Sequence, residues 1–140
     1  MKISASATAF VLSAFALGLV FLVARVDGDA MAPTIKNSDR VLVCKLEKEP
    51  KNNDIILFHP SGEPERIFIK RVIAVGGQTI DIKDGFVYLD GVKLEEDYVS
   101  DSIKGNYAGK YPKVVPEGCY FVLGDNRNNS KDSRDENGVG

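Results

Sequence analysis

An uncharged, largely apolar run near the N-terminus constrains this chain more than any other feature of its sequence. The run extends from Ile3 to Ala24 and contains 22 residues without an acidic or basic side chain. A helix of that length would extend ~33 Å at ~1.5 Å per residue, enough to cross the ~30 Å hydrocarbon core of a bilayer. The run therefore predicts a transmembrane helix.

A cleaved secretory signal peptide is the alternative interpretation of the same run. Ala30 and Ala32 form the A-x-A pattern that is typical of a cleavage site. The apolar run is longer than the usual core of a signal peptide, however, and Pro33 follows the pattern directly. We therefore favour a retained anchor.

The charges that flank the run hardly determine its orientation. Lys2 precedes the run and Arg25 follows it, so the positive-inside rule barely separates the two possibilities. The short N-terminal stub favours a domain outside the cytoplasm. The expected organisation is a transmembrane anchor over residues 1–26 and an extracytoplasmic domain over residues 27–140.

Charge and cysteine usage exclude some classes of protein. Beyond residue 26 there are 16 basic and 20 acidic residues, a net charge of 16 − 20 = −4, which argues against a nucleic-acid-binding protein. Cys44 and Cys119 lie 75 positions apart without metal-site spacing, so we expect no metal. The two cysteines either form a disulfide or remain buried thiols, and their apolar surroundings favour buried thiols.

Short apolar runs separated by turn residues indicate a mainly β domain. Asp84-Gly85 and Asp90-Gly91 predict tight hairpins. Residues 95–118 are polar and glycine-dotted, which predicts a long surface excursion that can carry a short strand. The predicted strands are 40–46, 55–59, 66–75, 79–82, 86–89, 92–94 and 119–123.

The last part of the chain, from Gly124 onward, is strongly polar. After Leu123 the only apolar residue is Val139. Such a segment cannot build a core of its own. It is either disordered or wraps back onto the domain through hydrogen bonds and ion pairs.

Lys70 interrupts an otherwise apolar strand face. Alternation along residues 66–74 places it on one face with Phe68, Val72 and Ala74. Burial there would lower its pKa from ~10.4, so that a neutral amine could act as a base. A lone lysine more often reaches from a strand edge into water. Two further motifs favour the first interpretation here.

Three stretches together resemble the motifs of type I signal peptidases. Residues 28–34 resemble their Ser-Met-x-Pro-Thr motif with the serine replaced (the first box), and residues 68–77 resemble their lysine motif (the lysine box). Residues 124–134 match their Gly-Asp-Asn-Arg-x-x-Ser-x-Asp-Ser-Arg motif at every defined position (the third box). The order of the motifs and the N-terminal run match as well. The resemblance implies an antiparallel β fold and a membrane-bound Ser-Lys endopeptidase that needs no cofactor.

The resemblance also implies roles for individual residues. Position 30 would carry the nucleophile, with its backbone N–H helping to bind the oxyanion. Lys70 would be the general base, and Ser130 would orient its amine. Asp132 and Arg134 would form a structural ion pair.

The implied partners are signal peptides of exported preproteins and membrane lipid, at the bacterial cell membrane. The peptide, with small residues at −1 and −3, would bind as an extended strand beside residues 26–30 and beside Phe68 and Ile69. Val26, Met31 and Ile69 would line its pocket, although core packing explains these residues equally well. We expect no catalytic role for His59, the single histidine.

Ala30 has no atom that could attack a carbonyl carbon, so the chain as it stands is predicted to be inactive. One explanation is an engineered serine-to-alanine change, which we favour because it removes only one oxygen and every other residue of the boxes is intact. The alternative is a natural paralogue that binds preproteins without cutting them. A self-cleaving Ser-Lys peptidase of SOS-repressor type is less consistent, since such proteins carry a DNA-binding module in place of the apolar run.

The resemblance bears on the end of the chain as well. Family members normally continue beyond the third box with further strand, whereas this sequence ends at Gly140. We expect the peptidase domain to be C-terminally incomplete.

Overall fold

The computed structural model describes residues 18, 20–46 and 49–135, and these residues form an antiparallel β fold. The strands are β1 (Phe21–Arg25), β2 (Arg40–Cys44), β3 (Ile55–Phe58), β4 (Phe68–Val75), β5 (Thr79–Lys83), β6 (Phe86–Leu89), β7 (Val92–Lys93), β8 (Lys113–Val114) and β9 (Tyr120–Leu123). The predicted mainly β class is confirmed. Each predicted strand between residues 40 and 123 is present, within two residues of its expected ends.

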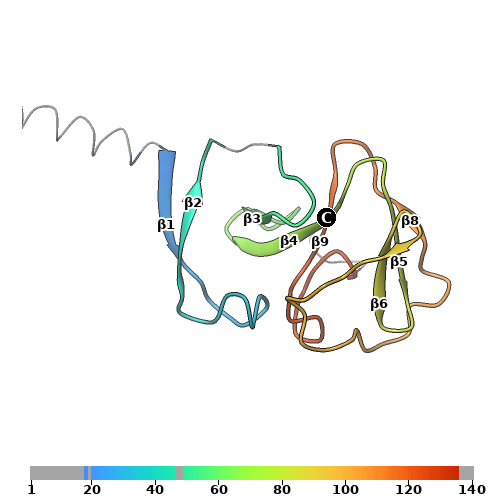
Figure 1. Cartoon of the computed structure of the whole chain (residues 1–140). Helices are drawn as coiled ribbons and strands as arrows, with labels where there is room; N and C mark the ends of the chain where they lie inside the picture. The colour runs from blue at the N-terminus through green and yellow to red at the C-terminus, as the bar shows by residue number, and fades with distance from the viewer. Residues whose placement is uncertain (1–17, 19, 47–48, 136–140) are drawn as a thin grey trace, which may run out of the picture.

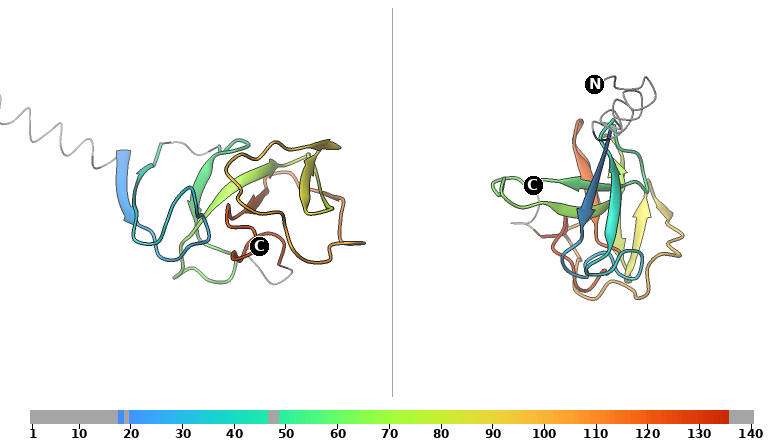
Figure 2. Two further views of the ribbon diagram at one scale, coloured as in Figure 1. Left: turned by 60° about the horizontal axis from the view of Figure 1, so that its bottom comes forward. Right: turned by 90° about the vertical axis from the view of Figure 1, so that its left-hand side faces the viewer.

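The strands form three sheets that follow one another along the molecule (Figure 1). The first is the β1–β2 hairpin, the second has the order β3-β4-β9, and the third has the order β7-β6-β5-β8. The left view in Figure 2 also shows the second sheet between the other two. The longest strand, β4, thus runs through the centre of the molecule and carries Lys70.

Strand β1 corrects the C-terminal end of the predicted transmembrane helix. Residues Phe21 to Ala24, which we expected to be helical, pair with β2 in the register Phe21↔Cys44 to Ala24↔Val41. A short apolar run does not distinguish strand from helix, and its aromatic and β-branched residues have a complementary partner in β2. Residues 3–17 and 19 of the predicted helix lie outside the described residues. Within the part of the chain that the structure describes, no helix is long and apolar enough to span a bilayer.

Two Asp-Gly turns set the register of the third sheet. Asp84 and Gly85 join β5 to β6, and Asp90 and Gly91 join β6 to β7. All four have positive φ, at 53°, 80°, 49° and 81°, as two-residue turns require to match the twist of antiparallel strands. Residues 95–118 then contain only β8, so the predicted excursion with a short strand is confirmed.

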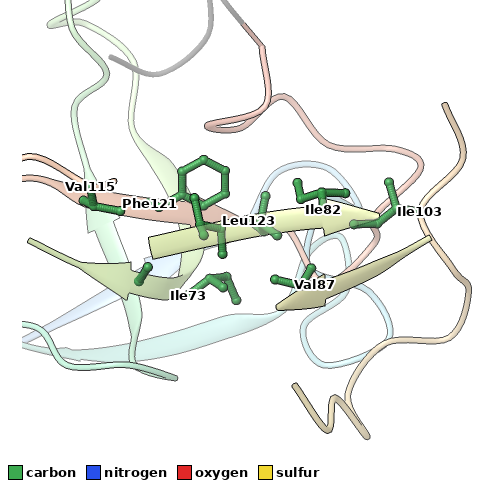
Figure 3. Packing of buried hydrophobic residues seen from close by; sticks show 9 residues of the cluster. Ile73, Ile82, Val87, Ile103, Val115, Phe121 and Leu123 are labelled. Carbon is green, nitrogen blue, oxygen red and sulfur yellow. The ribbon is translucent and has the colours of Figure 1, made fainter. Parts of the chain in front are cut away.

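The main hydrophobic core lies between the second and third sheets (Figure 3). Ile73 of β4 and Leu123 of β9 pack with Ile82 of β5 and Val87 of β6. Fully burying a side chain of this size stabilises the fold by ~1.5–3 kcal/mol. Because Leu123 directly precedes the third box, the core also fixes where that box begins.

A β-bulge in β4 changes the face on which some residues lie. The register between β4 and β9 shifts between Val72 and Ala74, so the alternation predicted along residues 66–74 ends at Val72. Ala74 packs in the main core with Ile73, and Val72 lies in a second, smaller cluster. Asn52 supports the bulge by donating from Nδ2 to Ile73 O at 2.8 Å.

Both cysteines are exposed and free, so the prediction of buried thiols is wrong. Cys44 is the last residue of β2, and Cys119 lies in the turn before β9. Exposure alternates along β2, where Val41 and Val43 are half-buried and Leu42 and Cys44 are exposed, so an apolar run does not bury every residue in it.

Candidate active site

The first box (residues 28–34) forms a compact loop between β1 and β2. Met31 anchors this loop, since its side chain is only 1% exposed. Ile35 N donates to Met31 O at 2.9 Å and closes the last turn. Ala30, the predicted nucleophile position, is therefore held in a partly buried and hydrogen-bonded loop.

The third box (residues 124–134) lies against the first. Asn126 donates from its backbone N to Ala30 O at 3.0 Å and from Nδ2 to Asp29 O at 3.1 Å. Thr34 Oγ1 donates to Asp125 Oδ2 at 2.5 Å. Of the two alternatives left open by the sequence, the described part of the polar segment, residues 124–135, therefore wraps back onto the domain.

Asp125 also connects the third box to the lysine box. Arg71 of β4 donates from Nε to Asp125 Oδ1 at 2.9 Å and from Nη2 to Asp125 Oδ2 at 2.7 Å. Both residues are buried, and a pair with two parallel hydrogen bonds is strongly directional. Three segments that are far apart in sequence thus meet at one carboxylate.

Lys70 precedes Arg71 on β4 and is 4% exposed. Its Nζ donates to Ile69 O at 3.0 Å and lies 5.1 Å from the centroid of the Phe68 ring. Burial lowers the pKa of Lys70 below its ordinary value, and the negative charge of Asp132 opposes this with a smaller effect. The predicted desolvation is confirmed, so this amine loses its proton at a lower pH than an exposed lysine would.

Ser130 lies at the point where the first and third boxes touch. A Cβ built on Gly124 would stand 2.5 Å from Ala30 O and would also collide with Ser130 Oγ. Ser130 Oγ is buried and has no hydrogen-bond partner among the described residues. The hydrogen bond expected between Ser130 and Lys70 is therefore not formed in the structure, and the orienting role of Ser130 stays a prediction.

The register of β4 and β9 relates Gly124 to Lys70. Arg71 pairs with Leu123, and continuing this antiparallel register by one residue brings Lys70 opposite Gly124. The three predicted catalytic positions thus converge on this glycine, although each comes from a different box.

We predict that Gly124→Ala disrupts this convergence. The added Cβ would meet the backbone carbonyl of Ala30, which cannot swing aside as a side-chain end can. Overpacking of this kind costs about 1–3 kcal/mol. In a protein that also carries Ala30→Ser, a displacement of the loop by about 1 Å should lower kcat by about 10²-fold. Thermal unfolding and a peptide-cleavage assay measure the two effects.

Gly109→Ala is the control for this prediction. Gly109 has a φ of 78°, but a Cβ added there meets nothing within 4 Å, so the substitution introduces backbone strain without a collision. We expect it to lower stability and leave kcat unchanged. A parental kcat in Gly124→Ala would show that the site does not converge at this glycine.

Asp132 and Arg134 form an ion pair with two hydrogen bonds. Arg134 donates from Nε and Nη2 to Asp132 at 2.7 and 2.8 Å, and Asp132 is fully buried. Gly124 N also donates to Asp132 Oδ2 at 3.0 Å. The pair therefore ties the end of the third box to its first residue.

An apolar groove of about 1020 Å³ lies between β2 and β3. Ile69, one of the predicted substrate-binding residues, lines it with Val41, Leu42, Ile56 and Leu57. Phe68 is half-buried. Val26 and Met31 are 7% and 1% exposed, so these two belong to the interior, one of the two interpretations that the sequence left open.

Two strand edges close to the first box carry no partner strand in the described structure. The first is the outer edge of β1, which pairs only with β2. The second is the start of β4, because β9 pairs with β4 only from Arg71 onward while Phe68 to Lys70 pair with β3 alone. An unpaired edge can accept an extended peptide as an added strand.

Several residues that organise the site had no predicted role. Three of them belong to the boxes: Arg71, Asp125 and Asn126. Polar side chains so close in sequence to the expected catalytic positions could have indicated a role in the site. Glu96 contacts the third box but belongs to no motif, so sequence reasoning missed it.

His59, for which we expected no catalytic role, is exposed. The described ranges contain no group of three or more histidine, cysteine or acidic residues that could hold a metal.

The structure thus brings together a buried lysine, a buried hydroxyl without a hydrogen-bond partner among the described residues, and the loop of the first box. Comparison with known proteins identifies the family. The sequence model of the family described as signal peptidase, peptidase S26, matches residues 2–140. The chain therefore belongs to this family.

Individual relatives agree with this assignment. Over 135 residues the chain is 43% identical to a probable signal peptidase I-1 of Synechocystis, covering 84% of this chain and 65% of that protein. Over 124 residues it is 40% identical to signal peptidase I U of Bacillus subtilis, covering 82% of this chain and 65% of that protein. The chain thus spans just under two thirds of the length of these relatives.

A solved structure is similar as well. The crystal structure of a signal peptidase I from Enterococcus faecalis superposes with a TM-score of 0.52 at 37% sequence identity. The match covers 62% of this chain and 86% of that one.

Proposed function

We propose that this chain is the peptidase domain of an enzyme that removes signal peptides from exported preproteins, and that it is inactive with Ala30 in place. The observation that carries the proposal is the meeting of the Ala30 carbonyl and the Ser130 hydroxyl at Gly124, opposite a desolvated Lys70. The names of the relatives support the substrate class.

The proposed mechanism needs a hydroxyl at position 30. With Ala30→Ser, the neutral Lys70 amine takes the hydroxyl proton while the oxygen attacks the scissile carbonyl, and the backbone N–H of residue 30 donates to the oxyanion. The protonated amine then gives its proton to the leaving amine. Water, deprotonated in turn by Lys70, hydrolyses the acyl-enzyme and restores the serine. Ser130 has an unused hydroxyl with which to orient the amine during these transfers.

The substrate would bind as an extended strand next to the unpaired edges of β1 and β4. Backbone hydrogen bonds along these edges would hold any sequence in register. The preference for small residues at −1 and −3 rests on the resemblance to the family. The groove lined by Ile69 adds apolar surface for neighbouring residues of the signal peptide.

A single-pass location in the bacterial cell membrane, with the domain outside, also belongs to the proposal. The apolar run from Ile3 onward is its sequence support. In the structure, Leu22, Val23 and Leu42 on the β1–β2 hairpin are 51%, 62% and 67% exposed. Apolar residues exposed at the end of such a run, and on the strand paired with that end, suit contact with a lipid surface.

A preprotein-binding protein without catalytic activity is the second candidate, and Ala30 itself is the observation that favours it. Both candidates predict that the chain as it stands binds a peptide spanning a signal-peptide cleavage site and leaves it intact. They differ when a nucleophile is supplied.

Ala30→Ser tests the proposal. The variant, in detergent or lipid and with any C-terminal continuation of the natural protein, should cut a preprotein after its −1 residue, and mass spectrometry of the two products should locate the cut. Ala32→Ser, which adds the same oxygen two residues away, is the control and should produce no cut. If Ala30→Ser binds the peptide and leaves it whole, the binding-protein candidate replaces the peptidase.

A further inference from the structure

A partly buried network of charged and aromatic side chains adjoins the candidate site and takes no part in the mechanism above. Its members outside the three boxes are Glu96 and Tyr98, in a turn that follows β7. Val99 N donates to Glu96 O at 3.1 Å and closes this turn. The network therefore brings a segment of the long excursion against the catalytic half of the molecule.

Glu96 holds Arg127 of the third box. Arg127 donates from Nη1 to Oε2 at 2.8 Å and from Nη2 to Oε1 at 2.6 Å. Arg127 is buried, with its side chain 1% exposed, and Glu96 is half-buried, with its side chain 11% exposed. Arg127 Nε donates to Gly124 O at 3.0 Å, so its guanidinium is fixed between Glu96 and the glycine on which the site converges.

Tyr98 holds Arg71 of the lysine box. The Arg71 guanidinium carbon lies 3.9 Å from the centroid of the Tyr98 ring, which leaves the edge N–H groups of Arg71 free to bind Asp125 and Asn53 O. Tyr98 Oη donates to Glu96 Oε1 at 2.9 Å. Burial and the charge of Glu96 raise the pKa of Tyr98, so its hydroxyl remains a donor in neutral and alkaline solution.

We propose that Glu96 and Tyr98 act as a clamp that positions the first box and Gly124 for the reaction, an inference that rests on the proposed function. One path of contacts leads from Tyr98 through Arg71 and Asp125 to Thr34 of the first box. The other leads from Glu96 through Arg127 to Gly124. The Tyr98–Glu96 hydrogen bond joins the two paths.

The geometry favours positioning over a general contribution to stability. Planar guanidinium groups that are paired on two edges and stacked on a face have one allowed orientation, unlike apolar contacts, which tolerate sliding. The groups at the ends of both paths belong to the site. A rate that depends on near-attack geometry is sensitive to displacements of about 1 Å in such groups.

The test uses proteins that carry Ala30→Ser. Tyr98→Leu removes the ring over Arg71 and the bond to Glu96, and it should lower kcat about 10–100-fold while changing KM by less than about 3-fold. Tyr98→Phe keeps the ring and removes only the bond, so its kcat should fall between those of the parent and Tyr98→Leu. Glu96→Gln keeps the shape but removes the charge that pairs with Arg127, and it should lower kcat at least about 10-fold.

Tyr88→Leu is the matched control. Lys83 Nζ lies 4.3 Å from the centroid of the Tyr88 ring, so the same substitution removes a similar contact between a cation and a ring in the third sheet. We expect its kcat to equal that of the parent. The proposal is overturned if folded Tyr98→Leu keeps the parental kcat, or if Tyr88→Leu lowers kcat as much. Should Tyr98→Leu fail to fold, Tyr98→Phe and Glu96→Gln carry the test, and parental kcat in both overturns it.

Amide hydrogen exchange separates failure of the clamp from failure of the proposed function. In the Ala30 chain, Tyr98→Leu should accelerate exchange at Asn126 and Ile35, whose N–H groups bind within or against the first box. Tyr88→Leu should not. If exchange accelerates as expected but Ala30→Ser never cuts, the clamp stands and the proposed function fails. If Ala30→Ser cuts and exchange at both amides stays unchanged in Tyr98→Leu, the clamp is refuted and the proposed function stands.

Discussion

Lys70→Met, combined with Ala30→Ser, should abolish cleavage and leave a folded protein. Methionine replaces the apolar stem of the lysine but has no amine to take a proton from the serine hydroxyl. Because the members of a catalytic unit act together, the loss of one costs on the order of 10⁶ in kcat. Single-turnover assays with a preprotein measure a loss of this size, and circular dichroism verifies the fold.

The same substitution should increase stability in the Ala30 chain. Burial lowers the pKa of Lys70 in the folded state, whereas the unfolded chain keeps a value of ~10.4. Between these two values the unfolded state binds more protons, so the stability of the parent rises with pH through this window. The advantage of Lys70→Met should therefore be full below the folded-state pKa and shrink as the pH approaches ~10.4. Urea unfolding at several pH values measures it.

Lys83→Met is the control for both effects. Lys83 is on β5 with its side chain 54% exposed and its amine 3.5 Å from Asp81, so it lies outside the site. Neither kcat nor the pH dependence of stability should change appreciably. Cleavage that survives Lys70→Met would mean that another group is the base. If Lys70→Met were as stable as the parent at every pH, the charged Lys70 amine would not be buried at a cost in free energy.

Asp125→Ala should be the most destabilising single substitution in the site. It would leave the buried Arg71 guanidinium without its partner, and breaking a buried pair in this way costs about 3–5 kcal/mol. For a domain of this size that corresponds to a fall in Tm of roughly 10–20 °C. Thr34 loses its acceptor at the same time, so the first box is released and, with Ala30→Ser present, cleavage should be lost.

A double variant separates the two consequences. Arg71→Met with Asp125→Leu removes both charges and should recover most of the stability, because the desolvation cost disappears with the pair. Cleavage should stay lost, since Thr34 still has no acceptor. Glu63→Ala removes two exposed ion pairs, with Arg66 and with Lys131 of the third box, and should change Tm little, because solvent screens both pairs. Equal effects of Asp125→Ala and Glu63→Ala would mean that Asp125 does not hold the boxes together.

Local signals were sufficient for most of the strands. The Asp-Gly turns at residues 84 and 90 fix their hairpins because few residues other than glycine tolerate consecutive positive φ. Phe21 to Ala24 of β1 were wrongly predicted to be helical, because a short apolar run is compatible with helix and strand alike until its partner is known. The bulge after Val72 was also missed, since it depends on Asn52, which is distant in sequence.

The candidate site, too, could be predicted only in part from the sequence. The burial of Lys70 followed from strand alternation, because Phe68 and Val72, which flank it on the same face of β4, are apolar. Thr34 and Arg71 both donate to the carboxylate of Asp125. Predicting these contacts required knowledge of which loops meet, and the periodicity of the sequence does not give that information. Glu96 was the least predictable residue, because charged residues in polar excursions are usually solvated and only the fold buries this one against Arg127.

The pH dependence of preprotein cleavage by the Ala30→Ser variant tests the account most directly, because it reports both the reaction and the group that drives it. We predict a single cut after the −1 residue, with kcat/KM rising as the pH increases and reaching a plateau once Lys70 is neutral, at an apparent pKa below ~10.4. The rise should disappear, together with the activity, in Lys70→Met. Absence of cleavage at every pH, or cleavage whose rate does not depend on pH in this range, would contradict the assignment of Lys70 as the base of a signal-peptide-cleaving site.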